Sequence, residues 1–387
     1  MEKVRLGSQI KQIRGVSYKP TDLHNDLNDN SVILLRANNI SDGKLNFDDV
    51  VYVDKSKVKE EQYLKKGDIL VCASSGSKEL VGKAAFVKKD FTATFGAFCK
   101  LIRPMGCIAE YLGHYFNSPT YREKISALAL GANINNIRNE HIDELFVCFP
   151  NELEQKSIAS LLDKVTNLID KRKEQLSKLD ELVKARFVEL FGDPKENPKG
   201  YCKKQLKETC NVITGNTPSR AVSEYYGEHI EWIKTDNIVS ELINPTTATE
   251  YLSEKGLAVG RTVEKDSILM ACIAGSISSI GRVCITDRKV AFNQQINAIV
   301  PNDYNTLFLY VMLQISKEYL VEGINMALKG ILSKSKLEEK EFIVPPMELQ
   351  EEFATFVKQT DKSKLELQKS LEKLELLKKA LMQKYFG

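Results

Sequence analysis

Cationic, amide and hydroxyl side chains crowd together in short, loop-like stretches in both halves of the sequence. They are "RGVSYKP" (14–20), "RANN" (36–39), "LGANINNIRN" (130–139), "TGNTPSR" (214–220), "KTDN" (234–237), "FNQQIN" (292–297) and "KGILSKSK" (329–336). Arg and Lys can bond guanine O6 and N7, while Asn and Gln pair with adenine N6 and N7. Ser, Thr and backbone N–H groups serve phosphate oxygens. This mixture favours the reading of bases, because non-specific phosphate binding needs mainly Lys and Arg.

We therefore predict two sets of DNA-contacting side chains, one in each half. The first set is Arg14, Ser17, Tyr18, Lys19, Arg36, Asn38, Asn39, Ser77, Lys78, Lys83, Asn133, Asn135 and Arg138. The second set is Thr217, Ser219, Arg220, Lys234, Thr235, Asn237, Ser276, Arg282, Asn293, Gln294, Gln295, Lys329, Lys334 and Lys336. For any single residue the alternative is a turn-forming role, since Asn and Ser also stabilise turns.

Sequence motifs of catalysis are missing from the same stretches. No two glycines lie two residues apart, so the chain has no G-x-G loop for a nucleotide or a methyl donor. The stretch "GSKELVGK" (76–83) has five residues between its glycines, where a Walker A loop has four, and Ala84 follows where that loop has Ser or Thr. No G-x-S-x-G nucleophile motif occurs. We predict that the chain has no catalytic residues of its own.

Cysteine, histidine and charge patterns narrow the class of protein further. The eight cysteines form no C-x-x-C pair and the four histidines form no H-E-x-x-H, so we predict no metal site and reduced, mostly buried thiols. The net charge is only +3, which means that any phosphate-binding surface depends on local sorting of charge. The beginning of the chain has no apolar signal core, and we expect a cytoplasmic protein.

An internal repeat organises the elements that must carry these loops. "KLDELVKARFVELFG" (178–192) and "KLELLKKALMQKYFG" (373–387) share seven residues at equal spacing, and at the same offset Gln155 matches Gln350. Each copy lies in a long segment without Pro or Gly that begins after a proline, which predicts two long helices. Apolar residues in both recur at alternating steps of three and four, the seam of a coiled coil. The predicted helix-pairing residues are Leu162, Val165, Ile169, Leu176, Leu179, Val183, Leu190, Val357, Leu367, Leu371, Leu374 and Leu381. Two unrelated amphipathic helices are the alternative.

The segments before the two helices also match each other. "LLRANNIS" (34–41) parallels "WIKTDNIV" (232–239), and "GSKELVGK" parallels "GSISSIGR" (275–282). Short apolar runs such as "SVILL", "DILVC" and "AAFVKK" predict short, mostly antiparallel strands, with helix near 108–130 and 305–322. The fold class is thus α+β, with two β-rich globular domains separated by two long helices of coiled-coil periodicity in an internal repeat. The predicted boundaries are 1–150, 151–192 (central helix), 193–345 and 346–387 (second helix).

With these motifs in duplicate, the whole chain resembles the DNA-specificity subunit of a type I restriction–modification system. The resemblance rests on "RGVSYKP…LLRANNI", "ITGNTPSR…WIKTDNI", the "GDIL…GS-x3-VG" stretch and the "PxxELxQ…KxxLxxxFG" helices. It implies that the two long helices form an antiparallel coiled coil with pseudo-twofold symmetry. This coiled coil would separate two target-recognition domains, each reading one half of a split, asymmetric site on double-stranded DNA. The implied partners are two methyltransferase (modification) subunits and motor/nuclease (restriction) subunits. The methyl donor, S-adenosylmethionine, would belong to the partner methyltransferase, with no cofactor in this chain.

The resemblance also gives the long helices a role as a spacer. About 35 helical residues at about 1.5 Å each span about 52 Å, enough to hold two domains about one DNA turn (34–36 Å) apart. The first half has "FGAFCK" where the second has "FNQQIN", which suggests unlike half-sites. Two other classes remain open. A coiled-coil adaptor that binds protein would lack sharp sequence preference on DNA, and a self-sufficient methyltransferase or nuclease would need the missing catalytic motifs.

Overall fold

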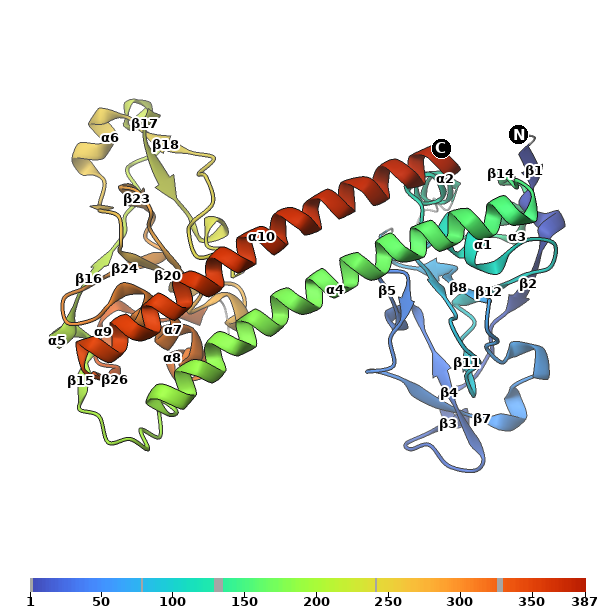
Figure 1. Ribbon diagram of the computed structural model, residues 1–387, viewed down its shortest axis with the longest axis horizontal. Coiled ribbons are helices and arrows are strands. Elements are labelled where there is room, and N and C mark those ends of the chain that lie inside the picture. The colour runs from blue at the N-terminus through green and yellow to red at the C-terminus, as the bar shows by residue number, and fades with distance from the viewer. Residues whose placement is uncertain (1–2, 78, 129–134, 241, 326–329) are drawn as a thin grey trace. The chain divides into compact units, whose positions relative to one another are not determined.

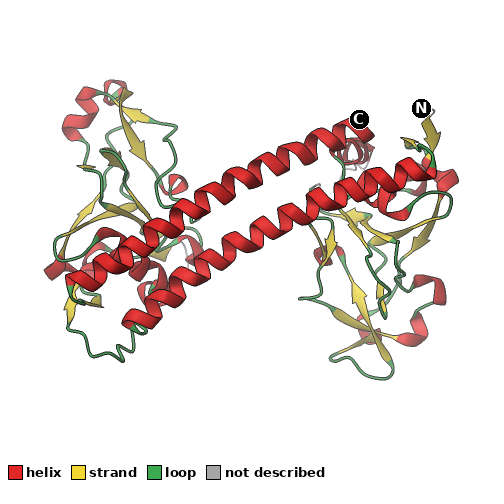
Figure 2. Cartoon of the chain, in the orientation of Figure 1, coloured by secondary structure: helices red, strands yellow, loops and turns green. Residues whose placement is uncertain are grey.

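The computed structural model describes residues 3–77, 79–128, 135–240, 242–325 and 330–387. By their contacts these residues form two compact units. Unit 1 comprises Met1–Lys173 and Lys369–Gly387, and unit 2 comprises Glu174–Gln368. Each unit combines short strands with short helices and includes part of two long helices (Figures 1 and 2). The domain boundaries drawn from the sequence kept the long helices apart from the globular parts, whereas the contacts divide each long helix between the two units.

The two long helices are α4 (Glu152–Phe191) and α10 (Met347–Phe386), each of 40 residues. Both begin after a proline and contain neither Pro nor Gly, so no residue interrupts the backbone hydrogen-bond ladder. Gly192 follows α4 with a φ of +76°, a left-handed conformation that ends helices and that glycine adopts without strain. The Gly192 N–H still donates to the Val188 carbonyl at 2.8 Å.

Unit 1 contains two four-stranded sheets. The first has the order β10-β8-β12-β2 with antiparallel neighbours, and the second has the order β11-β4-β7-β3, in which β11 and β4 are parallel. Their strands are β2 (Ile10–Arg14), β3 (Leu23–His24), β4 (Ser31–Leu35), β7 (Val51–Asp54), β8 (Ile69–Cys72), β10 (Ala84–Phe86), β11 (Ala93–Phe95) and β12 (Cys99–Pro104). The described residues of this unit also form three two-stranded pairs: β1 (Lys3–Arg5) with β14 (Phe146–Cys148), β5 (Ile40–Ser41) with β6 (Lys44–Leu45), and β9 (Ser74–Ser75) with β13 (Asn135–Asn136).

Unit 2 repeats the strand order of the first sheet, but the fourth strand of its second sheet lies at the other edge, next to the strand that corresponds to β11. The first sheet is β16-β24-β20-β22 and the second is β18-β17-β23-β19, again with one parallel pair, β17 and β23. Their strands are β16 (Cys210–Thr214), β17 (Tyr226–Ile233), β18 (Tyr251–Leu252), β19 (Thr262–Val263), β20 (Ile268–Ala271), β22 (Val283–Ile285), β23 (Val290–Phe292) and β24 (Ile296–Pro301). The two-stranded pairs are β15 (Lys203–Gln205) with β26 (Glu341–Ile343) and β21 (Ile273–Ala274) with β25 (Gly330–Ile331).

Short helices flank the sheets in both units. The α-helices are α1 (Ala109–Phe116), α2 (Pro119–Leu128), α3 (Asn139–Asp143), α5 (Leu206–Thr209), α6 (Glu254–Val259), α7 (Thr306–Ile315), α8 (Lys317–Val321) and α9 (Lys334–Glu338). The 3-10 helices are η1 (Leu6–Gln9), η2 (Pro20–Asp22), η3 (Ala37–Asn39), η4 (Lys55–Lys57), η5 (Glu60–Gln62), η6 (Ser223–Tyr225), η7 (Thr235–Asn237) and η8 (Ile277–Ser279). Helices α1–α2 and α7–α8 lie where the sequence predicted helix near 108–130 and 305–322.

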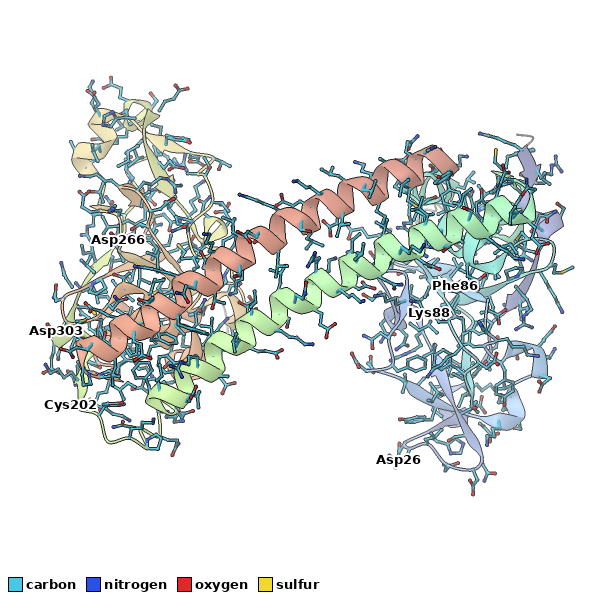
Figure 3. The ribbon with its side chains drawn as sticks, viewed as in Figure 1. Asp26, Phe86, Lys88, Cys202, Asp266 and Asp303 are labelled. Carbon is cyan, nitrogen blue, oxygen red and sulfur yellow. The ribbon has the colours of Figure 1, made fainter. Side chains whose placement is uncertain are left out.

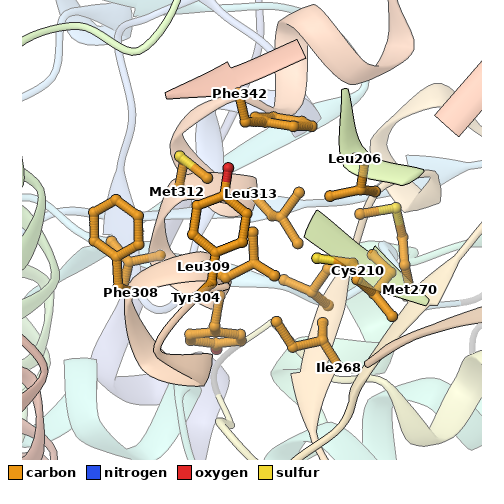
Figure 4. Packing of buried hydrophobic residues seen from close by; sticks show 14 of the residues in the cluster. Leu206, Cys210, Ile268, Met270, Tyr304, Phe308, Leu309, Met312, Leu313 and Phe342 are labelled. Atoms are coloured by element: carbon orange, nitrogen blue, oxygen red, sulfur yellow. The ribbon is translucent and has the colours of Figure 1, made fainter. Parts of the chain in front are cut away.

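The first sheet of each unit is buried on both faces. In β8, Ile69 and Val71 point into a cluster with helix α1, whereas Leu70 and Cys72 point into a cluster with the second sheet. This alternation is the period-2 geometry of a strand, and burial of both faces explains why the strand is a continuous apolar run. In unit 2, Met270 of β20 belongs to the helix-side cluster, which packs Phe308 and Met312 of α7 beside Leu206 and Phe342 (Figure 4).

A buried glutamine joins the start of each long helix to its globular part. In unit 1 the Gln155 amide accepts from the Ile108 N–H at 2.9 Å and donates to the Pro150 carbonyl at 2.7 Å. In unit 2 the Gln350 amide accepts from the Asn305 N–H at 2.9 Å and donates to the Pro345 carbonyl at 2.8 Å. The match of Gln155 and Gln350 in the sequence repeat therefore has a physical cause: both side chains satisfy the same backbone groups.

The long helices also supply core residues within each unit. In unit 1, Leu162 of α4 shares a cluster with Met382 and Phe386 of α10. In unit 2, Phe187 and Phe191 of α4 pack on Phe353 of α10. Of the predicted helix-pairing residues, Leu162, Val165, Ile169, Val183 and Val357 are buried, while Leu176, Leu179, Leu190, Leu367, Leu371, Leu374 and Leu381 are half-buried.

Candidate nucleic-acid interface

Four loops meet at one end of the two sheets in unit 1. They follow β2, β4, β8 and β11, and we call residues 14–20, 36–39, 73–77 and 96–99 the loop cluster of unit 1. The strand register brings them together, because Arg14 pairs with Lys100 and Cys72 pairs with Cys99 at the start of β12. The second sheet joins through the Gly96 N–H, which donates to the Leu35 carbonyl at 2.9 Å. Three of these loops contain residues that we predicted to contact DNA and that are far apart in sequence.

The loop cluster of unit 2 has the same construction. It comprises residues 214–220, 234–237, 272–276 and 293–296, which follow β16, β17, β20 and β23. Thr214 pairs with Asn297, and Ala271 pairs with Ile296. The Asn293 N–H donates to the Ile233 carbonyl at 3.0 Å, the equivalent of the Gly96 bond in unit 1.

A tight turn lies at the centre of each loop cluster. In unit 1 the Cys99 N–H donates to the Gly96 carbonyl at 2.8 Å, and in unit 2 the Ile296 N–H donates to the Asn293 carbonyl at 3.1 Å. A Cβ atom on Gly15 would lie 2.1 Å from the Gly96 carbonyl oxygen, and one on Gly215 would lie 2.1 Å from the Asn293 carbonyl oxygen. Only glycine allows so close an approach, so these two glycines hold the loop after the first strand against the turn.

The middle residues of the turn anchor the loop after β8 or β20. The Phe98 carbonyl accepts from the Ala73 and Ser74 N–H groups at 2.9 and 3.0 Å. The Gln295 carbonyl accepts from the Cys272 and Ile273 N–H groups at 2.8 and 3.3 Å. The backbone of the turn is thus held from both sides in each unit, while its side chains differ. Residues Ala97 and Phe98 stand in unit 1 where Gln294 and Gln295 stand in unit 2.

Carboxylates hold several of the predicted cations in place. In unit 1 the Asp49 carboxylate accepts from the Arg36 guanidinium at 3.0 Å and from the Asn38 amide at 2.7 Å. In unit 2 the Glu250 carboxylate accepts from Lys234 and, at 2.6 Å, from Arg220. The bond from Lys234, with a smaller contribution from Arg220, holds the pKa of Glu250 below its ordinary value. The carboxylates fix the orientation of these cations and also neutralise part of their charge. An oriented, partly neutralised cation is better suited to directed hydrogen bonds than to non-specific attraction of phosphate.

The guanidinium group of Arg220 packs on two aromatic rings. It lies 4.4 Å from the ring centre of Tyr226 and 5.3 Å from that of Trp232. The two rings are held in turn, because the Tyr226 hydroxyl donates to the Pro218 carbonyl at 2.7 Å and the Trp232 indole donates to the Asn216 carbonyl at 3.3 Å. Stacked guanidinium groups of this kind are held in one plane, so Arg220 presents its remaining donors to solvent.

Two asparagines of the predicted set have a structural role instead. Asn39 is 1% exposed and Asn237 is 6% exposed. The Asn39 amide accepts from the Arg36 N–H and donates to the Asn46 and Asp49 carbonyls, and Asn237 makes the corresponding bonds from Lys234 to the 246–247 segment. Asn293 is also buried and bonds to Gln295. Their hydrogen-bonding groups are used within the protein, and this burial argues against direct contact with DNA.

The remaining predicted residues differ in exposure. Those on the surface are Arg14, Ser17, Lys19, Asn38, Ser77, Arg138, Thr217, Ser219, Arg220, Ser276, Gln294, Lys334 and Lys336. Those half-buried are Tyr18, Arg36, Lys83, Lys234, Thr235, Arg282 and Gln295. Lys78, Asn133, Lys329 and the side chain of Asn135 lie outside the described residues. Of the surface residues, Arg138, which precedes α3, and Lys334 and Lys336, which lie on α9, are outside the loop clusters as defined.

Polar side chains also line a groove beside the long helices in each unit. In unit 1 it is lined by Phe86 and Lys88 (labelled in Figure 3), by α1 and by both long helices. His114 and Asp163 approach to 3.0 Å there, which holds the pKa of Asp163 below its ordinary value. The groove of unit 2 is lined by equivalent segments, including Asp180, Tyr310 and Asp361. Burial raises the pKa of Asp361, so the two grooves differ in electrostatics.

Buried thiols account for most of the cysteines. Burial raises the pKa of Cys72 to about 11 and that of Cys272 to about 12, so these thiols stay protonated at neutral pH. Among the described residues no group of three or more His, Cys, Asp or Glu side chains is placed to hold a metal ion. Within the same part of the chain no helix is long and apolar enough to cross a membrane.

Comparison with known proteins identifies the family. A model of the type I restriction modification DNA specificity domain matches residues 2–180 and, a second time, residues 198–378. The chain belongs to the type I restriction–modification DNA specificity family. The family model thus matches both halves, in agreement with the resemblance drawn from the sequence motifs.

Individual members of this specificity family match parts of the chain. It is 42% identical over 173 residues to the StySPI specificity subunit of Salmonella potsdam and to the EcoKI specificity subunit of Escherichia coli K12. Each match covers 44% of this chain and only 37% of the relative. The MjaIX specificity subunit of Methanocaldococcus jannaschii is 25% identical over 340 residues, which cover 82% of this chain and 76% of that protein.

Solved structures of specificity subunits share the fold. The S subunit of a type I restriction–modification system from M. genitalium has a TM-score of 0.61 at 17% identity, covering 100% of this chain and 96% of that one. A chain from a structural study of complex assembly and conformational transition in the type I system has a TM-score of 0.56 at 16% identity, covering 99% and 97%. At these identities the likeness concerns the fold alone.

Phe98, an exposed apolar residue in the loop cluster of unit 1, was not among the residues predicted from the sequence. Phe98 is 70% exposed at the tip of the central turn of unit 1. A signal was present, because the alignment of the two halves sets an apolar residue of "FGAFCK" against Gln295 in an otherwise polar loop set.

Proposed function

We propose that this chain is the sequence-specific DNA-binding subunit of a type I restriction–modification enzyme and that each unit reads one half of a split target. The observation that carries the proposal is the duplicated loop cluster. The two clusters have the same backbone hydrogen bonds around the turns at 96–99 and 293–296, yet they present different side chains. A common frame with variable exposed groups is what the recognition of two unlike half-sites requires.

Catalysis in this proposal belongs to partner subunits. Two modification subunits would transfer the methyl group from their own S-adenosylmethionine, and motor/nuclease subunits would complete the restriction enzyme. The chain contributes no catalytic residue and no cofactor in this scheme. Its loop clusters position the DNA, and its long helices carry the two units.

The long helices form an antiparallel coiled coil and set the distance between half-sites in the proposed assembly. Support comes from within each unit. Lys173 of α4 pairs with Glu375 of α10 at 3.4 Å in unit 1, and Arg186 pairs with Glu352 at 3.0 Å in unit 2. Forty helical residues at about 1.5 Å each are about 60 Å long, which exceeds one DNA turn of about 34–36 Å.

The decisive experiment is co-expression of the full chain with the modification subunit of its own system, followed by single-molecule sequencing for N6-methyladenine. We expect methylation at one motif that consists of two short half-sites around an unspecified gap of constant length. A stable complex with DNA that shows no sequence preference would contradict sequence reading and favour the coiled-coil adaptor. Methyl transfer by the chain alone would contradict the assignment of catalysis to a partner.

An insertion tests the spacer role separately. Four residues added near Lys173 lengthen the helix by about one turn and leave both loop clusters unchanged. We expect the gap in the methylation motif to lengthen while the half-sites stay the same. An unchanged gap in this variant would show that the helices do not set the spacing.

A further inference from the structure

We propose that Phe98 is a specificity-determining residue of unit 1, and that its ring contacts the 5-methyl group of a thymine in the major groove. This inference rests on the proposed function, since it names the base feature that one loop cluster reads. Apolar side chains, Phe among them, make such contacts with the thymine methyl group. No other base carries a methyl group at that position.

The exposure of Phe98 has no structural explanation within unit 1. The side chain is 70% exposed, whereas its neighbours Phe95 and Cys99 are both fully buried. A single exposed apolar residue is ordinary on a protein surface, and Met105 is exposed to the same degree in the same unit. Phe98 differs from Met105 in its position, because it lies in the loop cluster while Met105 follows the far end of β12.

The backbone of Phe98 is held by hydrogen bonds, so the ring extends from a fixed point of the turn. The turn from Gly96 to Cys99 is closed by a hydrogen bond of 2.8 Å, and the Phe98 carbonyl accepts two further bonds from residues 73 and 74. Gly15 packs against the same turn, and the Tyr18 ring lies close to Gly96. A rigid aromatic residue loses little conformational entropy when it binds.

Other loops of the same cluster expose polar groups that can bind the DNA backbone and neighbouring bases. Ser17 and Arg14 are exposed on the adjoining loop, and Asn38 is exposed on the next one. An apolar contact amid such groups is typical of base reading, where hydrogen bonds and methyl contacts act together.

The equivalent turn of unit 2 makes the contrast specific. Gln295 occupies the same backbone position, with its carbonyl bonded to residues 272 and 273. Gln294 beside it hydrogen-bonds to Thr217. Amides at this position match adenine edges, so the two turns differ in the chemistry they offer and not in their geometry.

The test compares thymine with uracil, which lacks only the methyl group. Once the methylation motif is known, DNA duplexes carry uracil in place of each thymine of the half-sites in turn, and binding of the full chain with its modification subunit is measured. We expect one position in one half-site where uracil weakens wild-type binding by about fourfold, the effect of one methyl-sized group. Phe98→Ala should bind the thymine and uracil duplexes equally, and Phe98→Leu should retain part of the preference.

Controls separate this inference from the proposed function. Met105→Ala should keep the wild-type preference, because Met105 is equally exposed but lies outside the loop cluster. If the wild type has a split motif but no position prefers thymine over uracil, or if Phe98→Ala keeps the preference, the inference fails and the proposed function stands. If the wild type has no motif at all, both fail. A loss of binding in Phe98→Ala that is equal for thymine and uracil, with unstacking of a 2-aminopurine probe, would indicate insertion of the ring between base pairs and overturn the methyl contact.

Discussion

Units 1 and 2 are alike where backbone groups bond to each other and unlike where side chains face solvent. Gly15 and Gly215 make the same close approach to a turn, and Gln155 and Gln350 make the same pair of hydrogen bonds. By contrast, Phe98 of unit 1 is aligned with Gln295 of unit 2, and Arg14 is aligned with Thr214. Hydrogen bonds and close packing therefore maintain the same backbone frame in both units, whereas the exposed side chains on that frame are free to diverge.

Removal of the arginine that pairs with a buried carboxylate should give the largest difference in stability between the units. The Asp68 carboxylate of unit 1 is 2% exposed and accepts two bonds from Arg103, at 2.7 and 2.8 Å. Arg103→Leu leaves this carboxylate buried without its partner, so we expect unit 1 to lose about 3 kcal/mol or more. Arg288→Leu in unit 2 should cost less, about 1–2 kcal/mol, because its partner Glu231 is 13% exposed.

Hydrogen exchange measured peptide by peptide reports each unit separately and checks this prediction. The double variant with Asp68→Asn and Arg103→Leu serves as the control, since it removes the buried charge and should recover part of the loss. Equal losses for Arg103→Leu and Arg288→Leu would contradict the assumed dependence on burial.

Replacement of the glycine that packs on the central turn should destabilise the two units by similar amounts. A Cβ in Gly15→Ala or Gly215→Ala collides with a backbone oxygen at 2.1 Å, so each unit should lose about 2 kcal/mol. Gly76→Ala and Gly275→Ala are matched controls, because no atom lies within 4 Å of the added Cβ. Thermal melting of the four variants provides the measurement, and a unit that tolerates its substitution would show that the shared frame is not essential there.

The buried glutamines should give a somewhat smaller effect. Gln155→Leu and Gln350→Leu each leave a backbone N–H and a backbone carbonyl without their partner, at an expected cost of about 1–2 kcal/mol. Gln359→Leu changes an exposed glutamine of α10 and should stay within about 0.5 kcal/mol of wild type. Urea denaturation measures the loss of stability in the three variants. A loss in Gln359→Leu as large as in Gln155→Leu or Gln350→Leu would contradict the prediction.

Protonation of Glu231 at low pH should destabilise unit 2. The hydrogen bond from Arg288 holds the pKa of this carboxyl below its ordinary value of 4.5. The unfolded chain therefore binds the proton more readily, so the stabilisation is present above about pH 4.5 and is lost as the pH falls through the lower, folded pKa. We expect Glu231→Gln to flatten the decline of unit 2 below pH 4.5, by less than about 1 kcal/mol, and to leave unit 1 unchanged. A steeper decline in this variant would reverse the sign of the argument.

Local similarity between distant segments predicted much of the fold. The short apolar runs at 31–35 and 68–72 became β4 and β8, and the segments without Pro or Gly became α4 and α10. The sequence could not assign Asn39, because an amide after a strand serves a turn and a base equally well, and burial alone decides between them. The exposure of Phe98 could not be predicted from the sequence either, because an apolar residue next to a buried strand ordinarily belongs to the core.

The phase of the second long helix shows a related limit. A repeat of 3.5 residues selects Leu381, yet Met382 and Phe386 are the buried side chains and Leu381 is half-buried. The steps from 378 to 382 and 386 are four residues each, the spacing of a helix that packs on a globular core. Because the sequence pattern averages over the whole helix, it misses a local change of partner from helix to globular domain.

The division of the long helices between the units has a consequence for synthesis of the chain. Unit 2 is a continuous stretch, Glu174–Gln368, whereas unit 1 needs Lys369–Gly387 to complete its core. Phe386 packs on Tyr111 and Tyr115, with ring centres 5.1 and 5.9 Å apart. The ribosome adds Tyr111 and Tyr115 before unit 2 and adds Phe386 after it, so unit 1 completes its core only after unit 2 has been synthesised. Unit 1 must wait, with aromatic side chains uncovered, until unit 2 has emerged.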